Sequence, residues 1–245
     1  MLDPGPRAAH GGGGVGPVSR WVLATSNAGK LREFTHALSP VLQAHQIELL
    51  AQSDLGVSSA EEPFDAFEDN ALAKARHASG QTGLAALADD SGICVDSLGG
   101  RPGVRSARYW ADHAHLAAPE IAKSLSAMNA DAANLAWLLH QVQTARQHQY
   151  PQATPPESFW NAAYVAAIAF VAGPDDANPI VVTGRWQGRI VTEPRGTGGF
   201  GYDPIFFDRE FAKTAAEMTL AEKQSVSHRG LALNTLLKAL ALSSI

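Results

Sequence analysis

Apolar residues recur along the first third of the chain at two spacings, which predict alternating strands and helices. An apolar run over 21–25 predicts a strand, and Leu31, Phe34 and Leu38 then follow at helical spacing. A second short strand is expected over 47–51. The stripe formed by Phe67, Ala71, Leu72, Ala75 and Ala78 predicts a second helix, which we expect to end at Gly80.

A third apolar run, over 84–88, leads directly into two acidic residues. It predicts a strand that carries Asp89 and Asp90 at its C-terminal end. In open α/β sheets this edge is where ligands bind. The pattern therefore indicates a candidate site.

The second half of the chain predicts helices, then strands, then helices again. The stretch 119–147 indicates one or two helices, and a proline-broken loop follows at 150–156. The β-rich runs of an antiparallel section are 162–172, 179–186 and 189–193. A capping box over 219–222 and a last helix from about Ser227 complete a mixed α/β fold.

Composition narrows the class of protein further. The 245 residues fit one large domain or two small lobes. Residues 1–19 are rich in Gly, Pro, His and Ala, so we expect a flexible extension there and one two-lobed domain over 20–245. The net charge of −5 argues against a nucleic acid polymer as partner.

The cellular location of the protein is predicted from sequence features that are absent. Cys94 is the single cysteine, which excludes an intramolecular disulfide framework. No apolar run reaches the roughly 18 residues that a membrane helix needs, and the glycine-rich N-terminus resembles no secretory signal. We therefore expect a cytoplasmic protein without a membrane partner.

The segment 25–30, Thr-Ser-Asn-Ala-Gly-Lys, has the size of a phosphate-binding loop. It lacks the first glycine of a Walker A motif, and Leu31 replaces the hydroxyl residue that binds Mg²⁺ in that motif. Small residues after a strand can still bring backbone N–H groups and a helix N-terminus onto an anion, with Lys30 as a point charge. The alternative is an ordinary strand-to-helix turn.

The adjacent acids Asp89 and Asp90 are costly together unless a cation or a proton-transfer role compensates. Mg²⁺ is the natural cation because it prefers one or two carboxylates plus phosphate oxygens, and Glu61 with Glu62 forms a second acidic pair. In the alternative interpretation Asp89 only caps a turn.

The glycine-rich stretch 196–204 permits close backbone approach to a ligand, and Phe200 or Tyr202 can stack on a base. The alternative is a hairpin with core aromatics. Lys223 adds a cation, and His228 and Arg229 lie at a helix start, where cations are disfavoured unless an anion or base is bound.

Five separated blocks give these candidates a common context. In chain order they are 25–30, Phe67-Glu-Asp-Asn-Ala71, Ala88-Asp-Asp-Ser-Gly92, Gly198-Gly-Phe-Gly-Tyr-Asp-Pro-Ile-Phe206 and Ser227-His-Arg-Gly230. Together they resemble the inosine/xanthosine triphosphate pyrophosphatases, over about 20–241. The resemblance implies a homodimeric α/β protein with two lobes flanking a nucleotide-binding cleft. It also implies Mg²⁺-dependent hydrolysis of ITP, dITP or XTP to the monophosphate and pyrophosphate.

The resemblance assigns roles by position. Asp90 is the implied proton acceptor beside the metal, and either Glu61 or Glu62 completes the metal site, because Pro63–Phe67 departs from the family's usual segment. The implied substrate-binding residues are Thr25, Ser26, Asn27, Ala28, Gly29, Lys30, Ser91, Phe200, Gly201, Tyr202, Asp203, Lys223, His228 and Arg229. The competing hypotheses are a P-loop-like kinase, a nucleotide sensor without catalysis, and hydrolysis of other modified triphosphates.

Overall fold

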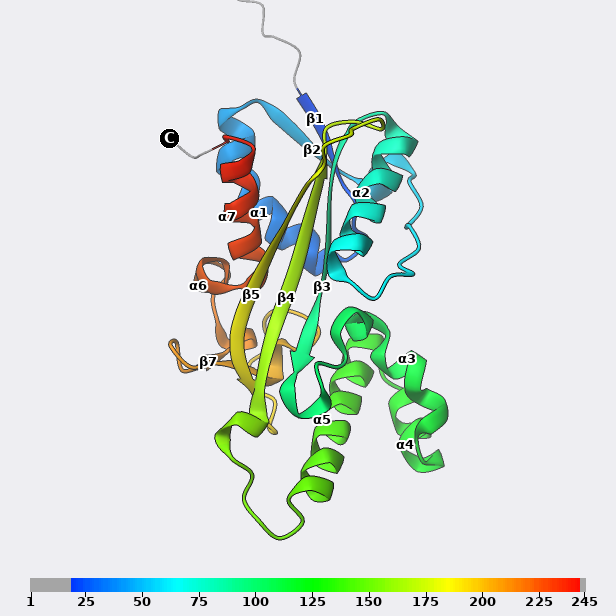
Figure 1. The fold of residues 1–245 in the computed structure, drawn as a ribbon, viewed down its shortest axis with the longest axis vertical. Coiled ribbons are helices and arrows are strands. Elements are labelled where there is room, and N and C mark those ends of the chain that lie inside the picture. The colour runs from blue at the N-terminus through cyan, green and yellow to red at the C-terminus, as the bar shows by residue number, and fades with distance from the viewer. Residues whose placement is uncertain (1–18, 243–245) are drawn as a thin grey trace, which may run out of the picture.

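The computed structural model describes residues 19–242 as a seven-stranded mixed sheet flanked by helices (Figure 1). The strands are β1 Ser19–Leu23, β2 Ile47–Ala51, β3 Ala85–Val95, β4 Asn161–Val171, β5 Ile180–Ile190, β6 Phe206–Asp208 and β7 Lys213–Thr214. The helices are α1 Ala28–Ala44, α2 Phe67–Thr82, α3 Tyr109–His113, α4 Pro119–Ser126, α5 Ala130–Gln149, α6 Leu220–Val226 and α7 His228–Ala239. The expected N-terminal extension lies, except for Ser19, outside the described residues.

The strand order is β2-β1-β3-β4-β5-β6-β7. β1 pairs in parallel with β2 and β3, whereas every pair from β3 to β7 is antiparallel. This confirms the predicted mixed α/β class, with the strand–helix alternation at the start and the antiparallel section at the end. The two-lobed cleft stays a prediction.

Successive side chains of the strands point to opposite faces of the sheet, so each face packs in a different hydrophobic core. Leu23 and Leu87 face α1 and α7, where they pack against large apolar side chains such as Phe34 and Leu233. Their neighbours on the other face are small, and they pack against the alanines of α2. The stripe predicted for that helix is therefore its buried face, and its alanines let the helix approach the sheet closely.

The long strands β3, β4 and β5 continue past these helices to a third core (Figure 1). There the helix α5 supplies Trp137, Leu138 and Val142, which pack with Tyr164 and Trp186 of the sheet. Trp137 is thus a core aromatic. The predicted helical stretch 119–147 is two helices, α4 and α5.

Two predicted boundaries are wrong. Gly80 lies inside α2, and the helix instead ends before Gly83, whose φ of +71° is the left-handed conformation that glycine adopts easily. The runs 179–186 and 189–193 are not two strands: β5 continues without a break over Ile180–Ile190, and residues 191–193 lie outside any strand. At Gly188 a Cβ would lie 2.5 Å from the Phe206 ring and 2.7 Å from the Phe207 carbonyl oxygen, so glycine there lets β6 pack closely against β5.

Within residues 19–242, no helix is both long enough and apolar enough to cross a membrane.

Candidate active site

The two adjacent aspartates lie inside β3, not at its end as the sequence predicts. The strand continues to Val95 because it stays paired with β4 along its whole length. The strand that ends is β1, whose last pair with β3 joins Leu23 to Leu87. The aspartates therefore lie just past the C-terminal end of β1, where one edge of β3 is left uncovered.

Asp89 and Asp90 point to opposite faces of the sheet because successive side chains of a strand alternate. Asp89 contacts Lys30 of α1 and Arg229 of α7, and Asp90 contacts residues of α2. They are thus not a carboxylate pair that shares one cation. Each is compensated by its own set of partners.

Asp89 belongs to a buried network of three acids and three bases on the α1/α7 face. Its ion pairs are Lys30 at 2.9 Å and Arg229 at 3.2 Å. Glu33 of α1 accepts from Arg229 and lies 2.8 Å from Lys223, which in turn donates to Asp203 at 2.6 Å. The formal charges balance, which explains how a helix N-terminus tolerates Arg229.

Burial and neighbouring charges set the protonation of this network. Burial by itself would raise the pKa of Asp89, but Arg229 and Lys30 outweigh it and hold the pKa well below its usual range. The pKa of Glu33 is lowered against burial in the same way by Arg229 and Lys223. Burial, with Arg229 and Lys223 nearby, drives the pKa of His228 far below its usual value, so its imidazole is neutral.

Asp90 is held on the other face by α2. Asn70 donates from Nδ2 to Asp90 Oδ2 at 3.0 Å, and Lys74, one helical turn later, lies 3.5 Å from Asp90 Oδ1. Asn70 also bonds both the N–H and the carbonyl of Phe64. It thereby ties the loop that carries Glu62 to the strand that carries Asp90.

The two acidic positions of that loop differ in placement. Glu62 accepts from Lys74 at 2.7 Å, pairs with Arg108 at 3.2 Å and lines the same cavity as Asp90. Glu61 is exposed and does not line it. Burial raises the pKa of Asp90, whereas Lys74 and Arg108 outweigh burial and lower the pKa of Glu62.

The glycine-rich loop is folded around Asp203. Its carboxylate accepts from the Phe200 N–H at 2.9 Å and from the Tyr164 hydroxyl at 3.2 Å. Gly199, with φ +71°, leaves no room for a side chain beside that carboxylate. The Phe200 ring then lies over Gly29, where an added Cβ would come within 2.7 Å of the ring atom Cε1.

Tyr202 is placed differently from Phe200. It is buried in the third core and donates its hydroxyl to the Ser106 carbonyl at 2.8 Å. Of the two aromatics proposed to stack on a base, Phe200 is therefore the one with a partly exposed ring.

A cavity of about 110 Å³ joins both faces around the open edge of β3. The sequence-predicted residues that line it are Asn27, Lys30, Glu62, Asp90, Ser91, Phe200, Gly201, Tyr202, Asp203, Lys223, His228 and Arg229. Outside the lining lie Thr25, Ser26, Ala28, Gly29 and Glu61. Within the predicted phosphate loop, Thr25 accepts from the Asn27 N–H and Asn27 caps α1 through the Lys30 N–H.

Residues of the site that have no role in the sequence prediction include Glu33, Asn70 and Lys74. The signal was present for two of them, since Asn70 and Lys74 interrupt an otherwise apolar face of α2 four residues apart. Glu33 had no such signal, because only the fold shows that it lies between Lys223 and Arg229.

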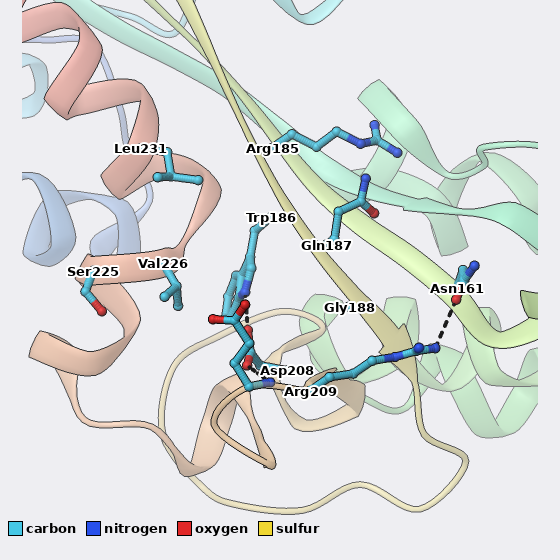
Figure 2. A pocket seen from close by; sticks show the side chains of 11 residues that line it. Asn161, Arg185, Trp186, Gln187, Gly188, Asp208, Arg209, Ser225, Val226 and Leu231 are labelled. Atoms are coloured by element: carbon cyan, nitrogen blue, oxygen red, sulfur yellow. Dashed lines mark hydrogen bonds between the residues drawn. The ribbon is translucent and has the colours of Figure 1, made fainter. Parts of the chain in front are cut away.

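A larger cavity, of about 520 Å³, lies elsewhere, beside β5 and α6 (Figure 2). Its acid Asp208 accepts from the Trp186 indole at 2.6 Å and from two backbone N–H groups, and Arg209 bonds Asn161 at 3.2 Å. None of the predicted site residues lines it. Although this cavity is the larger of the two, it is therefore not the candidate active site.

The carboxylates of Asp90 and Glu62 suit Mg²⁺ only together with a bound ligand that supplies further oxygen atoms. Within residues 19–242, no group of three or more His, Cys, Asp or Glu residues could hold a metal ion. Asp90 and Glu62 supply two carboxylates, and Lys74 already places a positive charge between them. Two carboxylates plus phosphate oxygens is a usual ligand set for Mg²⁺, so these residues fit the ion.

Comparisons with known proteins show the family to which this chain is similar. A model of the Ham1 family matches residues 21–239. The dITP/XTP pyrophosphatase of Burkholderia pseudomallei is 45% identical over 222 residues, covering 91% of this chain and 93% of the relative. That of Shigella flexneri is 44% identical over 223 residues, covering 91% and 98%.

Solved structures extend the similarity to three dimensions. A HAM1 protein from Coxiella burnetii superposes with a TM-score of 0.71 at 35% identity, covering 92% of this chain and 100% of that one. A nucleoside-triphosphatase or dITP/XTP pyrophosphatase from Mycobacterium abscessus gives 0.61 at 41% identity, covering 89% and 98%. With matches that span most of its length, the chain belongs to the Ham1 family.

Proposed function

We propose that the protein hydrolyses ITP, dITP and XTP to the corresponding monophosphate and pyrophosphate, which keeps deaminated purines out of DNA and RNA. The observation that carries this proposal is one cavity that combines Asp90 and Glu62 with Lys30 and the start of α1. Its curated relatives are named as dITP/XTP pyrophosphatases.

The triphosphate is bound by the positive end of α1 and by two lysines. The helix N-terminus and Lys30 attract phosphate oxygens, and Lys223, which also lines the cavity, adds a second charge. Burial lowers the pKa of Lys30, and this is partly offset by Asp89. Asp89 pairs with Lys30, and Asp203 pairs with Lys223, so these two acids hold the lysines in place.

Mg²⁺ is the metal we propose, with Asp90 and Glu62 as its protein ligands; Glu61 is too exposed for this role. When bound, Mg²⁺ neutralises the charge that develops on the triphosphate oxygens. Asn70 fixes the orientation of the Asp90 carboxylate toward the cavity.

Asp90 accepts the proton of the attacking water. The water oxygen forms a bond to the α-phosphorus, and the bond from that phosphorus to the bridging oxygen of the pyrophosphate breaks in line. Burial raises the pKa of Asp90, which favours this role, whereas bound Mg²⁺ would lower the pKa again. Lys30 and Lys223 stabilise the charge on the departing pyrophosphate.

The base is held by the Phe200 ring and by the lining residues around His228. The neutral imidazole of His228 stacks on Tyr164 with ring centroids 4.7 Å apart, and its Nδ1 has no hydrogen-bond partner within the described chain. Arg229 contributes less directly than the sequence suggests, because its guanidinium already donates to Asp89, Glu33 and Ser91.

Substrate entry requires the cavity to widen. Its volume of about 110 Å³ is below the roughly 300–1,000 Å³ of typical ligand pockets. Asp131 of α5 accepts from the Gly201 N–H at 3.0 Å and so joins α5 to the glycine-rich loop. We expect this contact to open when the nucleotide binds.

The test is a pyrophosphate-release assay with Mg²⁺ that compares ITP, XTP, dITP, ATP and GTP. Preference for the first three, with pyrophosphate as product, is expected. Orthophosphate release, equal use of ATP, or binding without turnover would each contradict the proposal. Chelation of the metal should abolish activity, and added Mg²⁺ should restore it.

The variant Asp90→Asn tests the proposed base. We expect kcat to fall by at least about a hundredfold, the usual range for losing a general base, with an unchanged circular dichroism spectrum. Retention of more than about a tenth of the activity would remove Asp90 from the mechanism.

A homodimer and a cytoplasmic location also stay predictions, and sedimentation of the purified protein tests the first.

A further inference from the structure

The ammonium group of Lys74 lies between the two carboxylates that we assign to the metal. It is 2.7 Å from Glu62 Oε1 and 3.5 Å from Asp90 Oδ1. The Lys74 side chain is only 12% exposed. A positive charge of the protein itself therefore occupies the space between these acids.

We infer that Lys74 is a displaceable counter-ion, which fills the cation position of the free enzyme and leaves it when the metal arrives with the triphosphate. This inference rests on the proposed function, because it takes Glu62 and Asp90 as the metal ligands. It assigns Lys74 a positioning role that the sequence analysis does not contain.

The physical reason is competition for the same two carboxylates. Two acids brought together without a cation repel each other, and a single ammonium relieves that repulsion. A divalent ion that approaches the free enzyme must displace this ammonium. Arg108, which lies 3.2 Å from Glu62, further weakens the attraction between Glu62 and the divalent ion. The free enzyme should therefore bind divalent metal weakly.

The substrate reverses the balance. A triphosphate brings negative charge and additional oxygen ligands into the cavity, which strengthens metal binding. It also gives the released ammonium a new partner, because Lys74 contacts Asp90, which lines the cavity. The metal and the nucleotide should consequently bind together, with little metal bound beforehand.

The experiment is a Mn²⁺ titration of the full-length protein without nucleotide, followed by the electron paramagnetic resonance signal of free Mn²⁺. We expect Lys74→Met to bind Mn²⁺ at least about tenfold more tightly than the unmodified protein, because the competing charge is gone. Lys74→Arg should bind as weakly as the parent, because it keeps the charge. Arg76→Met is the matched control, since Arg76 is an exposed cation of the same helix.

A gain in affinity separates this role from structural damage, which would weaken metal binding. Equal or weaker binding by Lys74→Met would overturn the inference. If Lys74→Met does not give the native circular dichroism spectrum, Lys74→Gln replaces it, because the amide keeps a hydrogen bond to Glu62 without the charge.

A further pair of variants separates the failure of this inference from failure of the proposed metal site. Adding Glu62→Gln or Asp90→Asn to Lys74→Met should remove the gained affinity. If the gain persists in both, the metal binds elsewhere and the inference falls with the proposed ligands. The pyrophosphate-release assay on the unmodified protein tests the activity independently of all these variants.

Discussion

Replacing Gly184 by alanine tests whether the contact between β5 and α7 positions the site. Gly184 lies on the face of β5 that packs against α7, the helix that begins with His228 and Arg229. A Cβ at this position would overlap the carbonyl oxygen of His228 and lie 2.7 Å from the backbone nitrogen of Ala232. Both are backbone atoms, so the helix itself has to move.

The expected magnitude follows from that overlap. Inserting a methyl group into a well-packed contact costs about 1–3 kcal/mol of unfolding free energy. The displaced helix also carries Arg229, whose guanidinium holds Asp89 and Glu33. Since a misplacement of about 1 Å can cost a hundredfold in rate, we expect kcat/KM to fall by roughly ten- to a hundredfold.

The same substitution at Gly80 is the control. Gly80 lies within α2, and a Cβ there would meet nothing within 4 Å. Gly80→Ala should stabilise the protein by about 0.5–1 kcal/mol, because alanine favours the helix more than glycine, and should leave activity unchanged. Urea denaturation and pyrophosphate release measure both variants. Parental stability and activity in Gly184→Ala would refute the argument.

Two further predictions concern buried charge. Arg229→Met removes the common partner of Glu33 and Asp89, so we expect a loss of about 3–5 kcal/mol in urea denaturation; a loss below about 1 kcal/mol would show that the network is not buried as described. His228 has its pKa lowered in the folded protein, so the unfolded state binds the extra proton as pH falls below about 6.5 and stability is lost in that direction. Between pH 6.5 and 5, this should contribute a decline of up to about 1.4 kcal/mol per pH unit that disappears in His228→Gln, and an unchanged slope in that variant would exclude His228 as its origin.

Local patterns in the sequence predicted the elements that depend on neighbouring residues. Helical spacing located α1 and α2, Thr219 caps α6 in the predicted capping box, and α7 begins at His228, next to the expected start at Ser227. The separate blocks 25–30, 88–92 and 198–206 supplied eight of the eighteen residues that line the cavity. These features can be predicted from the sequence because periodicity, capping and glycine content are properties of short segments.

The tertiary structure determined which partners the charged residues of those blocks contact. Asp89 and Asp90 look alike in the sequence, but strand alternation gives one to Arg229 and the other to Asn70 and Lys74. Likewise, Glu62 rather than Glu61 lines the cavity. Such choices depend on which distant helices cover each face of a sheet. The sequence by itself therefore determined which elements and chemical groups this protein has, and only packing between distant segments determined which charges meet.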